Sequence, residues 1–305
     1  MSCNECYTGT IRRDAVPTGR EEVVHGLPTY VTGPDDGVTP LGTVVFLTDA
    51  FGWKFRNSRV LADSYARRVP CTVYVPDMMN GHGLGEDVLV KLDASKRSPT
   101  ESWIAHALRR AWNILTVLPS IFGVVWLSRQ AVTMPRLVPW MRAVRSSTTP
   151  TTGSDSEGGK PPKIGVAGFC WGGLYSVLLT HDKPDHRVTV SEKEYPLVDC
   201  AFSAHPGMLK IPADIDAVVQ PLSVANGDND EYMGTKKMEQ LVSILGLKNA
   251  QQGHEVHEAV VYPGAKHGFA VRGDWDDPPQ KEQLEESEDQ AVAWFRRRFE
   301  TPWTS

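Results

Sequence analysis

The chain has 305 residues, of which 41% are hydrophobic, and a formal net charge of −5 at pH 7. A composition this apolar can build a large core and argues against global disorder, and the length exceeds that of a typical single domain. The acidic balance argues against nucleic acid as the main partner, since the one dense basic run, Arg296–Arg298, belongs to an expected terminal helix.

The cysteine content indicates free thiols rather than a disulfide framework. The count is odd and the spacing irregular; the five are Cys3, Cys6, Cys71, Cys170 and Cys200. The first residues lack the apolar run of a secretory signal, so we expect a reducing, cytoplasmic location. The first two cysteines could supply two ligands to a structural zinc, but such a site needs four and no second pair follows. We therefore expect no metal.

The first third of the chain alternates between strands and helices. Residues 21–32 alternate loosely around a Gly-Leu-Pro turn, which is typical of two short strands. The apolar run at 43–48 predicts a central strand, the helical spacing of 57–68 predicts a helix, and 71–75 predicts the next strand. This order is typical of a mostly parallel α/β sheet wound on both faces.

Residues 101–145 depart from this rhythm and predict a helical insertion. Helical spacing covers 100–118, and the apolar run at 114–127, which contains Pro119, is shorter than the ~20 residues of a spanning helix. We interpret it as two helices, or one bent helix, forming a lid over the active site. A segment lying on a membrane surface is the competing interpretation. Residues 146–162, rich in Ser, Thr, Gly and Pro, predict a flexible loop.

The rest of the chain resumes the alternation without any internal repeat. Strands are expected at 163–167, 197–204, 221–226 and 257–262. Helices are expected at 174–179, 236–247 and 281–299. We therefore expect residues 1–305 to form a single domain.

The motif Gly-Phe-Cys-Trp-Gly-Gly at 168–173 lies between the strand at 163–167 and the following helix. Glycines two positions before and after Cys170 allow the strained strand–turn–helix geometry of a nucleophile elbow, with cysteine where serine usually stands. The helix N-terminus would help to stabilise negative charge there. An inert core cysteine is the alternative, but the spacing favours a nucleophile.

A thiol nucleophile needs a base and a group that orients the base. After Cys170, an acidic pair follows one later strand and His267 follows the last, so all three lie at the carboxyl ends of strands, where open α/β sheets carry their sites. Asp230 stands three residues after a glycine and is preferred to Asp228, which could instead stabilise the turn. His205 also follows a strand, and we expect it to be a loop or pocket-wall residue.

Two backbone N–H groups should stabilise the oxyanion of the reaction. We expect one from Trp171, directly after the nucleophile, and the other from Ala50 in the loop after the first central strand. Asp49 would then lie beside the thiol, where a carboxylate could hold or withdraw its proton or raise its pKa. The alternative is that Asp49 is an ordinary turn residue at the end of a strand.

These motifs resemble those of the dienelactone hydrolase family. Residues 168–173 match the family's nucleophile motif, 264–269 resemble its histidine loop, and Asp-Ala-Phe-Gly at 49–52 stands where the family has an acidic residue, an apolar residue and Phe-Gly. The similarity covers roughly residues 20–100 and 160–300.

The resemblance implies an α/β-hydrolase fold without a cofactor, a Cys170–His267–Asp230 triad, and hydrolysis of small lactones or esters. Three features depart from the bacterial members. Asp49 is one methylene shorter than the usual glutamate, Arg272 lies one residue further along, and the longer stretch at 101–162 resembles fungal relatives.

We therefore predict a cysteine-dependent hydrolase that cleaves an ester or lactone carbonyl through an acyl-enzyme. Arg272 either binds a substrate carboxylate or is a surface residue. The aromatic residues expected near the site indicate a bulky, flat substrate such as an aromatic, polyketide-like lactone. They are Phe51, Trp53, Trp171 and Phe269, with Trp103, Trp112 and Trp126 of the expected lid. The alternatives are a thioesterase or acyl transferase with the same triad, and a non-catalytic, membrane-associated binding protein.

Overall fold

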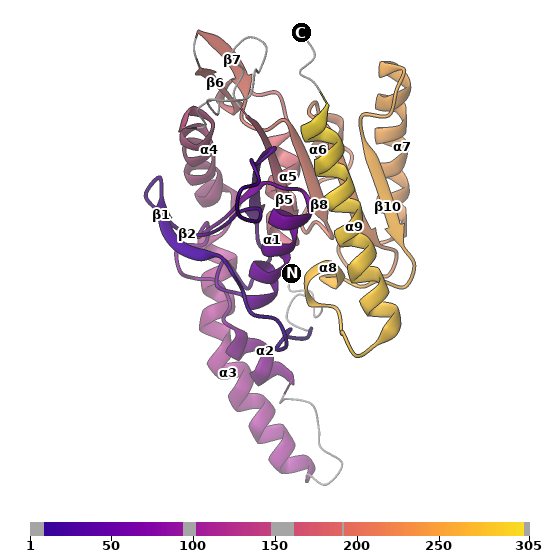
Figure 1. The fold of residues 1–305 in the computed structure, drawn as a ribbon. Coiled ribbons are helices and arrows are strands. Elements are labelled where there is room, and N and C mark those ends of the chain that lie inside the picture. The colour runs from indigo at the N-terminus through magenta and orange to yellow at the C-terminus, as the bar shows by residue number, and fades with distance from the viewer. Residues whose placement is uncertain (1–8, 94–101, 148–161, 191, 302–305) are drawn as a thin grey trace.

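A computed structural model describes residues 9–93, 102–147, 162–190 and 192–301. Its centre is an eight-stranded sheet in the order β1-β2-β4-β3-β5-β8-β9-β10 (Figure 1). The strands are β1 (Arg20–Val24), β2 (Leu27–Thr32), β3 (Gly42–Leu47), β4 (Thr72–Pro76), β5 (Lys163–Phe169), β8 (Cys200–Ala204), β9 (Leu222–Gly227) and β10 (Glu258–Tyr262). Strand β2 is antiparallel to β1 and β4, and every other pairing is parallel.

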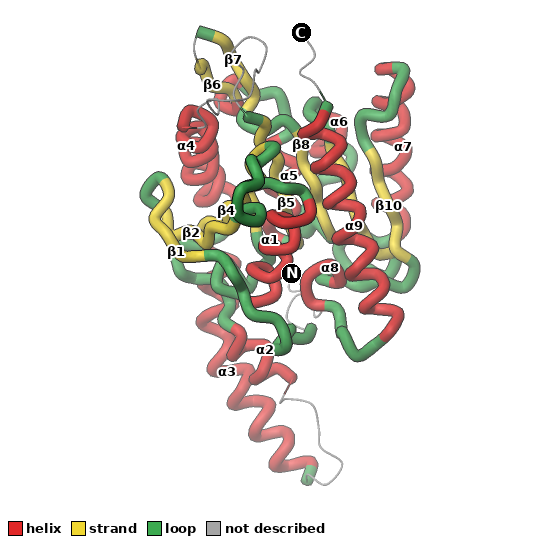
Figure 2. Tube along the Cα trace, in the orientation of Figure 1, coloured by secondary structure: helices red, strands yellow, loops and turns green. Residues whose placement is uncertain are grey.

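Helices flank the sheet and the strands run between them (Figure 2). They are α1 (Arg56–Arg68), α2 (Glu86–Asp93), α3 (Trp103–Leu127), α4 (Gln130–Ser147), α5 (Trp171–Leu179), α6 (Ala213–Asp216), α7 (Thr235–Gln252), α8 (Phe269–Arg272) and α9 (Pro278–Glu300). A separate antiparallel pair consists of β6 (Arg187–Val190) and β7 (Lys193–Pro196).

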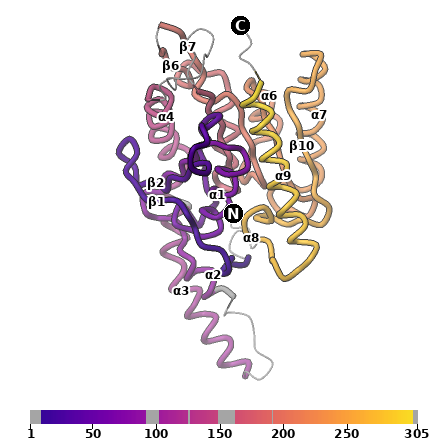
Figure 3. Tube along the Cα trace, in the orientation of Figure 1, coloured from indigo at the N-terminus to yellow at the C-terminus, as the bar shows by residue number. Residues whose placement is uncertain are grey.

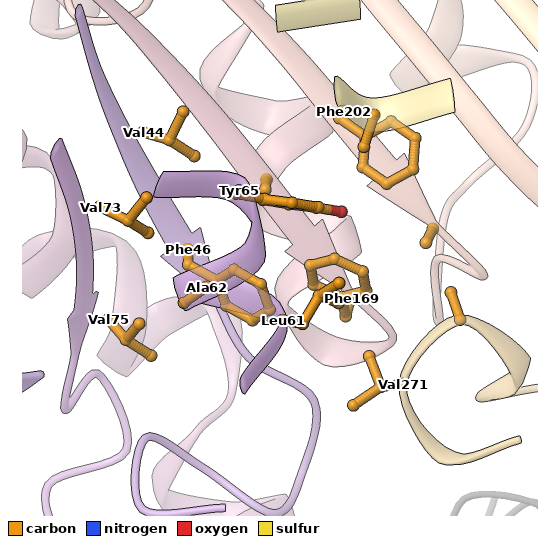
Figure 4. Close-up of a cluster of buried hydrophobic side chains, with 14 of the residues drawn as sticks. Val44, Phe46, Leu61, Ala62, Tyr65, Val73, Val75, Phe169, Phe202 and Val271 are labelled. Atoms are coloured by element: carbon orange, nitrogen blue, oxygen red, sulfur yellow. The ribbon is translucent and has the colours of Figure 1, made fainter. Parts of the chain in front are cut away.

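The central strands are buried on both faces because their side chains alternate between two cores. In β3, Val44 and Phe46 belong to one hydrophobic cluster, with side chains of α1 and α9, whereas Val45 belongs to a second cluster with α4, α5 and α7. The first cluster is seen in Figure 4, where Phe46 stacks on Phe169 of the adjacent β5 at a ring distance of 4.6 Å. A mostly parallel sheet covered on both faces was the predicted architecture.

Most predicted elements agree with the structure to within a few residues. The main difference on the sheet is the strand predicted at 197–204, of which only Cys200–Ala204 joins the sheet, as β8. The preceding segment forms the β6–β7 pair, which the sequence pattern did not predict. The short helices α2, α6 and α8 were also missed, because four to eight residues carry too few helical repeats to stand out from a loop.

The insertion is built differently from the prediction. Helix α3 runs unbroken through Pro119 to Leu127. Ser128 and Arg129 separate it from α4, which begins at Gln130, so the break lies after the apolar run rather than inside it. Proline removes one backbone donor, which this long helix tolerates. Its first turns project away from the sheet (Figure 1). Whether the insertion acts as a lid stays a prediction, and most of the loop predicted at 146–162 lies outside the described residues.

The start of the described chain lies near α8, whereas α9 ends far from it, near the label C (Figure 3). Thr10 donates its backbone N–H to the carbonyl of Arg272 at 3.1 Å and its hydroxyl to the carbonyl of Gly273 at 2.6 Å. The segment before β1 therefore packs on the loop that follows the last strand. Cys3 and Cys6 lie outside the described residues.

Candidate active site

The residue after β5 has the strained backbone of a nucleophile elbow. Cys170 has φ 52° and ψ −108°, which is unfavourable for a residue with a Cβ. Its N–H donates to Ala204 at 3.1 Å, and its carbonyl accepts from Gly173 at 3.1 Å and from Gly207 at 2.9 Å. These bonds hold the strained turn in place. The side chain lies in the predicted position between strand and helix, and the residue is 5% exposed.

Two glycines make this turn possible because other parts of the backbone approach them closely. A Cβ on Gly168 would lie 2.3 Å from the carbonyl oxygen of Gly172, and one on Gly172 would lie 2.1 Å from the carbonyl oxygen of Leu47. The N–H of Gly172 donates to Thr48 at 3.0 Å. The loop after β3 therefore lies directly against the N-terminus of α5.

The predicted acid and base are in contact. His267 Nδ1 lies 2.9 Å from Asp230 Oδ2, and both side chains are fully buried. The other carboxylate oxygen, Oδ1, accepts the backbone N–H groups of Tyr232 at 2.7 Å and Met233 at 3.1 Å. Both oxygens of Asp230 are thus held, which fixes the orientation of the imidazole.

The neighbouring carboxylate has a different position. Asp228 is exposed and accepts the backbone N–H of Gly264 at 2.7 Å. It therefore ties the loop after β9 to the loop after β10. Of the two acids that the sequence left open, the geometry pairs Asp230, and not Asp228, with His267.

The end of β8 and the loop after it contact both Cys170 and His267. Ala204 of β8 and Gly207 of the loop bond to the backbone of Cys170. The ring of His205 lies edge-on to that of His267 at a centroid distance of 5.1 Å. His205 is fully buried, and burial holds its pKa well below the usual range, so the ring stays neutral. The sequence predicted a loop or pocket-wall residue here, and His205 is a buried residue of the loop after β8, in contact with the ring of His267.

Asp49 and Arg272 form a buried ion pair next to these residues. Arg272 Nε donates to Asp49 Oδ2 at 2.9 Å, and both side chains are 1% exposed. The other carboxylate oxygen accepts the N–H of Phe51 at 3.0 Å. Burial raises the pKa of Asp49, and the adjacent guanidinium opposes that rise. Arg272 is therefore not a surface arginine, which was one of its two interpretations.

The two predicted oxyanion donors lie on adjoining segments. Trp171 is the first residue of α5, so its N–H has no acceptor within the helix. Ala50 lies in the loop that Gly172 contacts through Thr48, and its carbonyl accepts from Leu84 at 2.8 Å. Their role as an oxyanion hole stays a prediction.

An open cavity of about 1030 Å³ borders the site. Its lining includes His267, Phe269 and Arg272, but Cys170 is not among the described residues that line it. The other two predicted substrate-contacting aromatics, Phe51 and Trp53, are not among the described residues that line it. Phe51 packs against Phe55 at a ring distance of 5.0 Å and lies under the guanidinium of Arg272, 5.2 Å from its ring. Trp53 lies under the guanidinium of Arg59, 5.0 Å from its ring. The structure therefore brings Phe269, but not Phe51 or Trp53, to this cavity.

Two absences hold for the part of the chain that the structure describes. It contains no group of three or more His, Cys, Asp or Glu side chains that could hold a metal ion. None of its helices combines the length and the apolar content needed to cross a membrane.

Comparison with solved structures defines the class of fold. A structure assigned as a dienelactone hydrolase from Klebsiella pneumoniae aligns with a TM-score of 0.52 and 17% identity, covering 91% of this chain and 98% of that one. A truncated carbohydrate esterase from gut microbiota aligns with a TM-score of 0.53 and 11% identity, covering 96% and 100%. The chain has an α/β-hydrolase fold.

Sequence comparison identifies the family. The model of the dienelactone hydrolase family matches residues 129–299, and the chain belongs to this family. It is similar to the hydrolase tropI of Talaromyces stipitatus, with 26% identity over 97% of this chain and 95% of that protein. The hydrolase pyvD of Aspergillus violaceofuscus is 24% identical over 96% of both chains. The protein is thus an ester or lactone hydrolase, which argues against the non-catalytic alternative.

Proposed function

We propose that this hydrolase uses Cys170 as a nucleophile and works through a thioester acyl-enzyme. The sulfur attacks the carbonyl carbon of an ester or lactone while Nε2 of His267 takes the thiol proton. The tetrahedral oxyanion is stabilised by the N–H groups of Trp171 and Ala50 and by the N-terminus of α5. The leaving alcohol takes the proton from the imidazolium, and a water molecule, deprotonated by the same ring, releases the acid.

The observation that carries this proposal is the buried hydrogen bond between His267 Nδ1 and Asp230 Oδ2, at 2.9 Å. Because Nδ1 faces the carboxylate, the proton that the ring carries at rest belongs there, and Nε2 is the nitrogen that can accept another. A buried carboxylate also stabilises the imidazolium that forms when the thiol gives up its proton. The strained backbone of Cys170 supports the same assignment, since such strain is characteristic of functional positions.

The pairing of Arg272 with Asp49 bears on the substrate class. One guanidinium and one carboxylate neutralise each other in the buried site, so an anionic substrate would have to compete with Asp49 for the arginine. We therefore favour a neutral ester or lactone. The ring of Phe269, which lines the cavity beside His267, supports a flat, aromatic, polyketide-like acyl or alcohol group.

The insertion is proposed to cover the site as a lid. The support is the position of Ser128, between α3 and α4. Its carbonyl accepts the indole N–H of Trp171 at 2.7 Å and the hydroxyl of Tyr175 at 2.9 Å. Both donors belong to α5, so the insertion is rooted beside the proposed nucleophile.

The test is an aryl ester assay combined with mass spectrometry. We expect Cys170→Ala to abolish turnover and Cys170→Ser to trap or slow the acyl-enzyme, seen as an adduct on the peptide that contains residue 170. Cys200→Ala is the matched control, because it removes another buried free thiol and should leave turnover within about twofold. Unchanged turnover in Cys170→Ala would refute the mechanism. Adding an alcohol or amine acceptor separates hydrolysis from acyl transfer by the product formed.

A further inference from the structure

Helix α3 carries apolar side chains on two opposite sides. Val117 and Val124 are buried in the core of the molecule. An apolar stripe on the other side consists of side chains that are more than half exposed: Ile104, Leu108, Trp112, Leu115, Phe122 and Trp126. At 100° per residue these six fall on one face, which is turned away from Val117 and Val124. The stripe runs nearly the full length of the helix.

Helices α3 and α4 carry arginines and no acidic residue. From residue 102 to residue 154 the sequence contains six arginines and no Asp, Glu or Lys, although the whole chain has a net charge of −5. Arg110 is exposed on the side of α3 away from the stripe, and Arg145 on α4 is buried against Asp199. Arg129, just after α3, is exposed, and its guanidinium lies 4.5 Å above the ring of Trp126. The C-terminal end of the apolar stripe therefore carries a positive charge in an acidic protein.

We propose that the apolar stripe of α3 docks on an anionic lipid surface, with the helix lying in the interface rather than crossing it. Exposed apolar side chains can insert among the headgroups, tryptophan is favoured at that depth, and arginines are attracted to anionic lipids. A second copy of the chain fits less well, because stacking two stripes would bring two copies of Arg129 together, and neither α3 nor α4 carries an acid to neutralise them.

The attachment of α3 to the rest of the molecule suits such a role. Asn113 donates to the carbonyl of Lys91 at the end of α2, at 3.0 Å, and Ser128 accepts the bonds from α5. The helix is thus fixed along one side and at its C-terminal end, while its first turns project from the sheet (Figure 1). Docking leaves these contacts intact and requires no rearrangement of the core.

The experiment is co-sedimentation of the full chain with vesicles of phosphatidylcholine alone or mixed with phosphatidylserine, at low and high salt. The test variant is Leu108→Glu/Leu115→Glu, at leucines that are 68% and 61% exposed. The control is Leu247→Glu on α7, at a leucine that is 63% exposed but lies outside the stripe. Circular dichroism tests whether each variant is folded. Sedimentation velocity without lipid reports self-association.

We expect the chain to bind the mixed vesicles, with binding that falls as salt rises. The double variant should bind roughly tenfold or more weakly, since it loses two apolar side chains and brings two carboxylates to an anionic surface. Leu247→Glu should bind like the unaltered chain. The proposal is overturned if neither vesicle binds, if Leu247→Glu weakens binding as much as the double variant, or if the stripe instead mediates a dimer that the double variant dissociates.

Discussion

Replacing Asp230 by asparagine removes the negative charge of the acid while keeping its shape. In the structure Oδ1 accepts two backbone N–H groups, from Tyr232 and Met233, and Oδ2 accepts from His267 Nδ1. The amide oxygen of asparagine can keep the two backbone bonds, so its NH₂ group must face the imidazole. Nδ1 then has to act as an acceptor, and the ring proton moves to Nε2, the nitrogen that should take the thiol proton.

The size of the effect follows from that geometry. A hydrogen bond to a charged group contributes about 1.5–3 kcal/mol, which alone corresponds to a loss of roughly 10- to 150-fold. The wrong tautomer adds to this, and the same change in Ser-His-Asp triads lowers kcat by about 10⁴-fold. We therefore expect Asp230→Asn to lower kcat by about 10² to 10⁴-fold. The fold should persist, because the backbone contacts of residue 230 are retained.

The measurement is the kcat of aryl ester hydrolysis, with thermal unfolding as the test of fold. Asp228→Asn is the matched control, because Asp228 lies two residues away, is exposed and accepts the N–H of Gly264. Its kcat should change by less than about threefold, as for most surface substitutions. If Asp230→Asn kept near-normal turnover, or if Asp228→Asn lost as much, the assignment of the acid would be wrong.

Two further predictions concern stability. Gly172→Ala places a Cβ 2.1 Å from the carbonyl oxygen of Leu47, so it should lower the free energy of unfolding by about 3 kcal/mol or prevent folding. Gly246→Ala on α7, whose Cβ would meet no atom within 4 Å, should instead be neutral or stabilising by up to about 1 kcal/mol in the same urea titration; equal losses would contradict the argument from close approach. Burial lowers the pKa of His257 from 6.5 to about 4, so the unfolded chain binds a proton that the folded one refuses as the pH falls through that window. The free energy of unfolding should therefore fall as the pH is lowered from 6.5 to 4, by up to about 3 kcal/mol from this residue, and His257→Gln should reduce that loss. An identical pH dependence in both proteins would contradict this assignment.

Local sequence predicted the elbow well because its requirements are local. A buried strand, a residue that tolerates strain, and glycines at two fixed offsets are all set within about ten residues, and each leaves a mark in composition. The order of the three site residues was also predictable, since parallel strands bring their carboxyl ends to one edge of the sheet. The positions of Asp230 and His267 followed from that rule, although 37 residues separate them.

The sequence could not predict where each side chain points. Both interpretations of Arg272 were compatible with its position, and only folding buries it against Asp49, 223 residues earlier in the chain. Similarly, Phe51 and Trp53 are neighbours in sequence, yet Phe51 lies under the guanidinium of Arg272 whereas Trp53 lies under that of Arg59. Proline within α3 suggested a break, but the helix has enough other hydrogen bonds to continue through it.

What the sequence by itself determined is therefore the set of strands, the turn that strains Cys170, and the order in which Cys170, Asp230 and His267 follow strands whose carboxyl ends share one edge of the sheet. The tertiary structure alone decided that Arg272 is held by Asp49 and that α3 exposes an apolar stripe. It also paired His267 with Asp230, the acid that the sequence favoured over Asp228. The physical reason is the range of the interactions. Backbone conformation and hydrophobic periodicity depend on neighbours in the chain, whereas ion pairs, ring contacts and exposure depend on residues that meet only after the sheet has formed.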